Sequence, residues 1–86
     1  MDANLHQQQG INHIKRVLDY APFVAADGRA TVHLTMEDWG VVADTLFAMN
    51  TPDELLPARV KSYRLTNDNR TIRLETDDLL IDVDPM

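Results

Sequence analysis

Acidic side chains are the candidate functional groups of this sequence, and they fall into two clusters. One cluster lies in a helical pattern that follows Thr35, and the other lies near the C-terminal end, in a turn and the strand pattern after it. An acidic surface attracts a basic protein and speeds its association, and it can also imitate the phosphates of DNA. We therefore predict that the partner is a basic protein. The predicted contact residues are Glu37, Asp38, Asp44, Asp77, Asp78, Asp82 and Asp84.

Metal binding finds little support in the residue spacing. The three histidines, His6, His13 and His33, lack the i, i+4 or H-E-x-x-H spacing that typifies a zinc site. The acids at 77–84 lack the alternating ligands, the glycine and the final glutamate of a calcium-binding loop. We predict no metal site.

Catalytic groups are equally scarce. The chain has no cysteine, and Ser62 has neither a neighbouring histidine nor a G-x-S-x-G turn. Its three glycines are isolated, so no glycine-rich loop is available to bind a phosphate. We predict that the protein is not an enzyme and holds no cofactor.

A basic segment separates the two acidic clusters. Residues 59–74 carry five basic side chains against one acid, whereas the whole chain has a net charge of −6. RNA-binding sheets stack bases on exposed aromatic rings, but Tyr63 is in phase with the apolar face of its strand. We therefore do not expect nucleic acid to be the partner. The alternative function is a small nucleic-acid-binding regulator that uses Arg59 to Arg73.

Length and composition limit the architecture. We expect 86 residues to form one domain, 1–86, whose stability comes from packing because cysteine is absent. No segment approaches the roughly 20 apolar residues of a membrane helix, and the first ten residues lack the features of a signal peptide. We expect a cytoplasmic protein that does not bind membranes.

The N-terminal half must supply the helices. Apolar spacing predicts a helix from Ala3 to Tyr20 that stops before Pro22, with residues 1–10 frayed because of Gly10. Asp27-Gly28 predicts a hairpin over residues 23–34 that places Phe23 opposite Val32. A second helix is expected from its Thr35 cap to Asn50, and a short helix is expected after Thr51.

The C-terminal third predicts a three-stranded antiparallel meander. With turns at Asp68-Asn69 and Asp77-Asp78, the apolar residues of all three strands fall on one face. The expected pairs are Tyr63–Leu74, Leu65–Ile72, Leu74–Ile81 and Ile72–Val83. The opposite face then carries the rows Arg64–Arg73–Asp82 and Thr66–Thr71–Asp84. The predicted core is Ile14, Leu18, Val32, Leu34, Trp39, Ala43, Leu46, Phe47, Leu65, Ile72, Leu74 and Ile81.

These elements predict an α+β domain: helix, β-hairpin, helix, short helix and meander, with the helices packed on one face of the sheet. In size, acidity and lack of cysteine it resembles phage- and plasmid-encoded inhibitors and immunity proteins, a likeness of composition. We therefore expect a non-enzymatic inhibitor or regulator of a larger, basic protein.

A structural homodimer, or a subunit of an assembly, is the second alternative. Trp39 is expected in the core, although tryptophan also anchors partners at interfaces. Four apolar residues are out of phase with the apolar faces, which is typical of an interface. They are Val41, Met49, Leu56 and Leu80.

Overall fold

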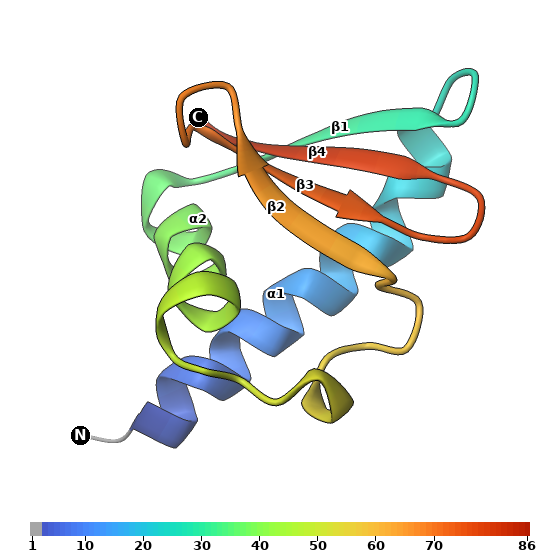
Figure 1. The fold of residues 1–86 in the computed structure, drawn as a ribbon. Coiled ribbons are helices and arrows are strands. Elements are labelled where there is room, and N and C mark those ends of the chain that lie inside the picture. The colour runs from blue at the N-terminus through green and yellow to red at the C-terminus, as the bar shows by residue number, and fades with distance from the viewer. Residues whose placement is uncertain (1–2) are drawn as a thin grey trace.

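The computed structural model describes residues 3–86 and places two helices against one face of a four-stranded sheet (Figure 1). The predicted α+β class is confirmed. The elements are α1 (Ala3–Val24), β1 (Arg29–Leu34), α2 (Met36–Ala43), the π-helical turn η1 (Asp44–Ala48), the 3-10 turn η2 (Asp53–Leu55), β2 (Ser62–Thr66), β3 (Thr71–Glu75) and β4 (Leu80–Pro85).

The sheet is mixed, with the strand order β1-β4-β3-β2. The meander of β2, β3 and β4 is antiparallel, and its predicted register is confirmed in both ladders. Asp77 and Asp78 form the predicted two-residue turn, closed by a hydrogen bond from Thr76 N to Leu79 O of 2.9 Å. The turn between β2 and β3 is longer than predicted and comprises residues 67–70.

The predicted hairpin over residues 23–34 is wrong. Asp27 and Gly28 do form a tight turn with positive φ angles of 56° and 77°, but this turn closes only one bridge, between Ala26 and Arg29. β1 pairs instead with β4, in parallel, with Val32 opposite Val83. Phe23 belongs to α1 and is 85% exposed. β1 pairs along six residues with the central strand β4, whose apolar side chains pack better than those of the alanine-rich segment before Asp27.

Pro22 does not end the first helix. α1 continues through it to Val24. A proline removes one helical hydrogen bond and crowds the carbonyl four residues earlier. Only two helical residues follow Pro22, so little helix depends on the missing bond, and Ala21 beside it is fully buried in the core.

The core lies between the helices and the inner face of the sheet. Leu18 from α1, Val42 from α2 and the central strands meet there. The prediction that Phe47 belongs to the core is wrong. Its side chain is 39% exposed and packs edge-on against Tyr63, with 5.7 Å between ring centroids. The buried apolar side chains are Ile11, Ile14, Val17, Leu18, Ala21, Ala30, Val32, Val42, Leu46, Leu56, Ile72, Leu74, Ile81 and Val83.

Several predicted core residues lie at its margin. Leu34, Trp39, Ala43 and Leu65 are partly buried and pack against the buried cluster. The Trp39 indole N–H donates to Val83 O at 2.8 Å, which ties α2 to the end of β4. Because tryptophan is amphipathic, this bond satisfies its polar atom while the ring packs on the core.

Gly10 lies where α1 crosses α2 and η1. The helix is continuous through it, and a Cβ atom there would overlap Thr45 Oγ1. Thr45 is fully buried and donates to Val41 O at 2.9 Å. The glycine therefore permits a close helix crossing. Within residues 3–86, no helix has both the length and the apolar character needed to cross a membrane.

Candidate functional site

Two parts of the described chain carry five acids each without lysine or arginine, residues 75–84 and residues 36–55, and we call the second the acidic side. It comprises α2, η1, η2 and the loop between them, and it contains five acids and neither lysine nor arginine. Glu37, Asp44, Asp53 and Glu54 are exposed, and Asp38 is half-buried. Three of the predicted contact residues, Glu37, Asp38 and Asp44, therefore lie in this part of the chain.

Part of the acidity stabilises α2 itself. Thr35 is the N-cap, and its hydroxyl accepts a hydrogen bond from Asp38 N at 3.1 Å, as the sequence predicts. Glu37 and Asp38 lie in the first turn, where negative charge is favourable beside the positive end of the helix dipole.

Two acids of this side face histidines of α1. His6 Nε2 lies 3.1 Å from Asp44 Oδ2, and His13 Nε2 lies 3.4 Å from Asp38 Oδ1. The Arg16 guanidinium contacts the other ring nitrogen of His13. These pairs line the junction of α1 and α2, so Asp38 and Asp44 also join the two helices.

A polar hollow of about 330 Å³ lies at this junction and is lined partly by His13, Arg16, Glu37 and Asp38. It holds no serine, threonine or cysteine that a histidine could activate as a nucleophile. Among residues 3–86, no group of three histidine, aspartate or glutamate side chains is arranged to hold a metal ion. The arrangement can therefore bind polar groups.

Exposed apolar side chains accompany the acids. Phe47 is partly exposed, and Leu55 is 49% exposed in η2. The Tyr63 hydroxyl, on the ring that packs against Phe47, donates to Asp53 Oδ1 at 3.4 Å. Burial, with the negative charge and hydrogen bond of Asp53, raises the pKa of Tyr63. The acidic side thus combines carboxylates with apolar surface, as partner-binding surfaces commonly do.

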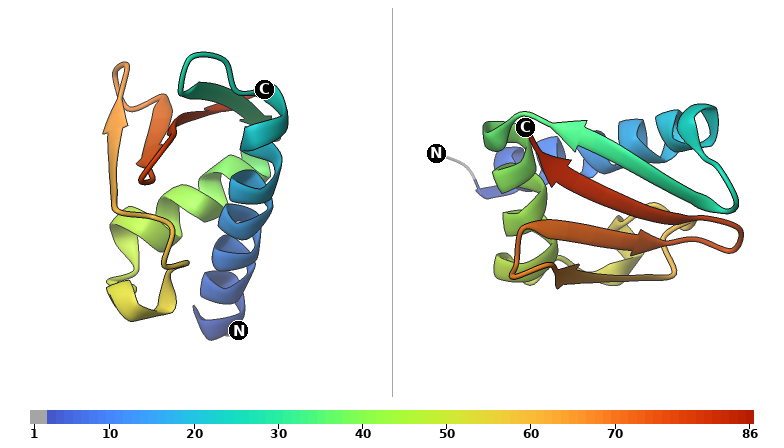
Figure 2. Two further views of the ribbon diagram at one scale, coloured as in Figure 1. Left: turned by 90° about the vertical axis from the view of Figure 1, so that its right-hand side faces the viewer. Right: turned by 90° about the horizontal axis from the view of Figure 1, so that it is seen from above.

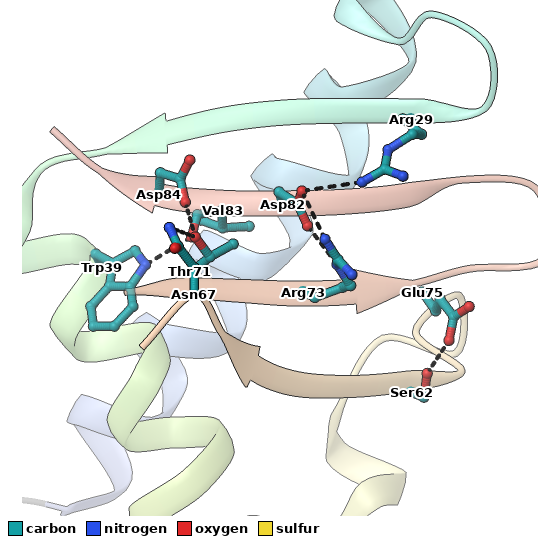
Figure 3. A network of polar contacts seen from close by, with 10 residues as sticks. All are labelled: Arg29, Trp39, Ser62, Asn67, Thr71, Arg73, Glu75, Asp82, Val83 and Asp84. Atoms are coloured by element: carbon teal, nitrogen blue, oxygen red, sulfur yellow. Dashed lines mark hydrogen bonds and ion pairs between the residues drawn. The ribbon is translucent and has the colours of Figure 1, made fainter. Parts of the chain in front are cut away.

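The predicted acids of β4 have a different environment. Asp82 lies on the open face of the sheet, where it accepts hydrogen bonds from Arg73 Nε at 2.8 Å and Nη2 at 3.3 Å (Figure 3). Arg29 Nη2 lies 3.8 Å from it. The hydrogen bond and charge of Asp82 raise the pKa of Arg73 further above its already high value. The charge of Asp82 is therefore balanced by the two neighbouring strands.

Asp84, Asp77 and Asp78 complete the predicted set. Asp84 accepts a hydrogen bond from the Thr71 hydroxyl on the open face. Asp77 and Asp78 are exposed in the turn between β3 and β4, at the opposite end of the sheet from α2 (Figure 1). The structure thus divides the seven predicted acids among the acidic side, the open sheet face and a distant turn.

The basic segment is also divided. Arg59 pairs with Asp19 at 2.8 Å, and Arg73 pairs with Asp82. Arg64 stands directly opposite Arg73 on the open face. Among the described residues, the strand positions that share this face with Arg64 and Asp82 carry no phenylalanine, tyrosine or tryptophan, and His33 of β1 is the aromatic ring on it.

Asp53 and Glu54 belong to the acidic side but were not among the predicted contact residues. The lack of lysine and arginine from residue 30 to residue 58 is the signal that could have identified them. The sequence matches no protein-family model, and neither a curated protein nor a solved structure is significantly similar to it.

Proposed function

We propose that this protein is a non-enzymatic binding module that inhibits or regulates a larger, basic protein through its acidic side. The observation that carries the proposal is the composition of residues 36–55: five acids, no lysine or arginine, and exposed Phe47 and Leu55 beside them. Carboxylates speed encounter with a positively charged surface, and the exposed apolar side chains add buried area once the two proteins are in contact.

The same surface could occupy a nucleic-acid-binding site on the partner, because its carboxylates carry the charge of phosphates. The acids of β4 contribute less to the proposal, since Asp82 is balanced by Arg73 and Arg29. The contact residues that we propose are Glu37, Asp38, Asp44, Asp53 and Glu54.

Two variants with the same net charge test the proposal. The first neutralises the acidic side by Glu37→Gln, Asp53→Asn and Glu54→Gln. The second neutralises exposed acids elsewhere by Asp68→Asn, Asp77→Asn and Asp78→Asn. Tagged forms of both variants and of the original protein are used to capture partners from a lysate of the native host, at low and at high salt.

We expect the original chain and the second variant to capture one dominant basic protein at low salt. The first variant should not capture it. High salt should weaken its capture because screening shortens the range of charge attraction. Equal loss in both variants would contradict the assignment to this surface. Capture that is indifferent to salt and to both variants would contradict the proposed function.

A further inference from the structure

We propose that the free edge of β1, with the part of α1 beneath it, binds an extended acidic segment of another protein as an added β-strand. The hollow along this edge is lined by no acid, and of its lining residues Arg16 alone also lines the polar hollow beside the acidic side. The proposal therefore does not depend on the function proposed above.

The backbone of β1 shows which groups are free. Leu80 N donates to Gly28 O at 2.9 Å, and Met86 N donates to Leu34 O at 2.8 Å, both toward β4. Successive residues of a parallel strand direct their backbone groups to opposite sides. Gly28 and Leu34 face β4, so Thr31 and His33 direct their N–H and C=O groups away from β4. β1 forms the edge of the sheet there, since its one neighbour in the strand order is β4.

Both ends of this edge are closed by local bonds. The N–H and C=O groups of Arg29 are bonded to Ala26, at 3.1 and 2.8 Å. At the other end, Thr35 O accepts from Trp39 N at 2.8 Å as α2 begins. The open part of the edge is therefore short and offers two residues, Thr31 and His33, to a partner strand.

A hollow of about 390 Å³ lies beside the same edge. It is lined by Arg16, Val17 and Tyr20 of α1 and by residues 31–34 of β1. Figure 2 shows α1 running beneath β1 and extending past its outer side, so that the helix forms a ledge along the edge. Tyr20 is 52% exposed, and Phe23 follows it at the i+3 position on the same helix face. A strand added to β1 would rest its inward side chains on this ledge.

The charge of the surroundings indicates the occupant. The hollow is lined by Arg16 and His33 and by no acid. Arg29 lies on the exposed face of β1, where Asp82 of β4 is 3.8 Å from it. An added strand would alternate its side chains between the open face and the helix ledge. An acidic residue would suit the ledge position beside Arg16, and apolar residues would suit the positions above Val17 and Tyr20.

A second copy of this chain fits the edge less well. Two-fold pairing of β1 with β1 of another copy would bring both α1 helices into the same layer beneath the joined edges (Figure 2). Helices need 8–10 Å between their axes. It would also place the Arg29 and His33 side chains of the two copies beside one another. An isolated extended segment has neither conflict.

The test uses a displayed library of short random peptides, selected on the full chain. Thr31→Pro removes the outward N–H while leaving the bonds to β4, because proline is tolerated on an edge strand whose N–H faces solvent. Thr31→Val is the matched control, since it retains that N–H. Arg16→Glu tests the charge, and Lys15→Glu is its control, because Lys15 does not line the hollow. Trp39 fluorescence during unfolding confirms that each variant is folded.

We expect enriched peptides that carry acidic and apolar residues at every second position, the positions that face the ledge. Their binding should weaken about tenfold or more in Thr31→Pro and in Arg16→Glu, and should change little in the two controls. The bound peptide should slow hydrogen exchange at the amides of Thr31 and His33. If Thr31→Pro does not fold, Arg16→Glu and the exchange measurement decide. Enrichment of basic peptides, equal binding by Thr31→Pro and Thr31→Val, or no enrichment would overturn the proposal, as would a concentration-dependent dimer that protects the same two amides.

Discussion

Gly10 and Gly40 show how a single methyl group has opposite consequences at two helical positions. A Cβ at Gly10 would overlap Thr45, whereas nothing lies within 4 Å of a Cβ at Gly40. Alanine favours a helix over glycine by about 1 kcal/mol, and overpacking a buried contact costs about 1–3 kcal/mol. The surroundings therefore decide which term is larger.

We expect Gly10→Ala to lower the free energy of unfolding by about 1–2 kcal/mol, because the overlap outweighs the gain in helix propensity. Gly40→Ala should raise it by up to about 1 kcal/mol. Urea unfolding of both variants, followed through Trp39 fluorescence, measures the two changes. A stabilised Gly10→Ala variant would mean that α1 and η1 are not in close contact.

Tyr63 provides a prediction about pH. Burial and Asp53 raise the pKa of its phenol, so the unfolded chain loses this proton at a lower pH than the folded chain. The free energy of unfolding should therefore fall as the pH rises from the ordinary pKa of about 10 to the raised value. Below that range, the contribution is fully present.

Absorbance titration in a Tyr20→Phe background isolates Tyr63, because these are the only two tyrosines. We expect Asp53→Asn to lower the pKa of Tyr63 without returning it to the ordinary value, since the burial remains. Asp44→Asn is the control and should leave the pKa unchanged. An unaltered pKa in Asp53→Asn would show that the contact between Asp53 and Tyr63 does not form in solution.

At the scale of elements, the turn between β2 and β3 carries the most unusual backbone. Three consecutive residues, Asn67, Asp68 and Asn69, have positive φ angles of 56°, 56° and 65°. Asparagine and aspartate tolerate this region better than most residues, and β-branched residues do so least. The conformation explains why a longer turn than the predicted one can still preserve the register.

We expect Asp68→Val to lower the free energy of unfolding by about 1 kcal/mol although the side chain is exposed. Asp68→Gly should be neutral or stabilising by a few tenths of a kcal/mol, since glycine adopts positive φ without steric cost but loses more entropy. Thermal and urea unfolding of the pair provides the comparison. Equal stability of both variants would contradict the left-handed conformation.

At the scale of the whole molecule, the chain closes its core without a partner. The buried apolar residues come from both helices, from Leu46 of η1, from Leu56 and from β1, β3 and β4, and they form one cluster. Their burial in the described structure needs no second chain. The exposed large apolar side chains lie outside this cluster, on the acidic side, along α1 and at Met86.

The midpoint temperature of unfolding should therefore be independent of protein concentration. Scanning calorimetry over a hundredfold range of concentration checks this expectation, with sedimentation equilibrium as an independent measure of mass. A midpoint that rises with concentration would favour the homodimer alternative and would direct attention to Tyr20 and Phe23.

Much of the fold could be predicted because its signals are local. The register of the meander follows from period-two alternation, since a slip of one residue would turn Ile72 and Leu74 to the polar face. The start of α2 could be predicted because threonine is a favoured N-cap residue. The hydrogen bond from Asp38 N to the Thr35 hydroxyl agrees with that prediction. The α+β class needs only these local patterns.

Other features depended on tertiary structure. β1 pairs with β4 across about 50 residues of sequence, and no local pattern specifies a parallel partner at that separation. The outward position of Phe47 and the helix through Pro22 depend on packing at the ends of α2 and α1.

The sequence by itself determined the class of the fold, the register of the meander and the segregation of charge, because each depends on residue types and short-range periodicity. Only the tertiary structure decided which acids share a surface. Asp82 is balanced by Arg73 and Arg29 because three strands bring them together, whereas Asp38 and Asp44 face histidines of α1 because α1 packs against α2 and η1. Distances between residues far apart in sequence depend on how the elements pack, and that packing also leaves the edge of β1 free above α1.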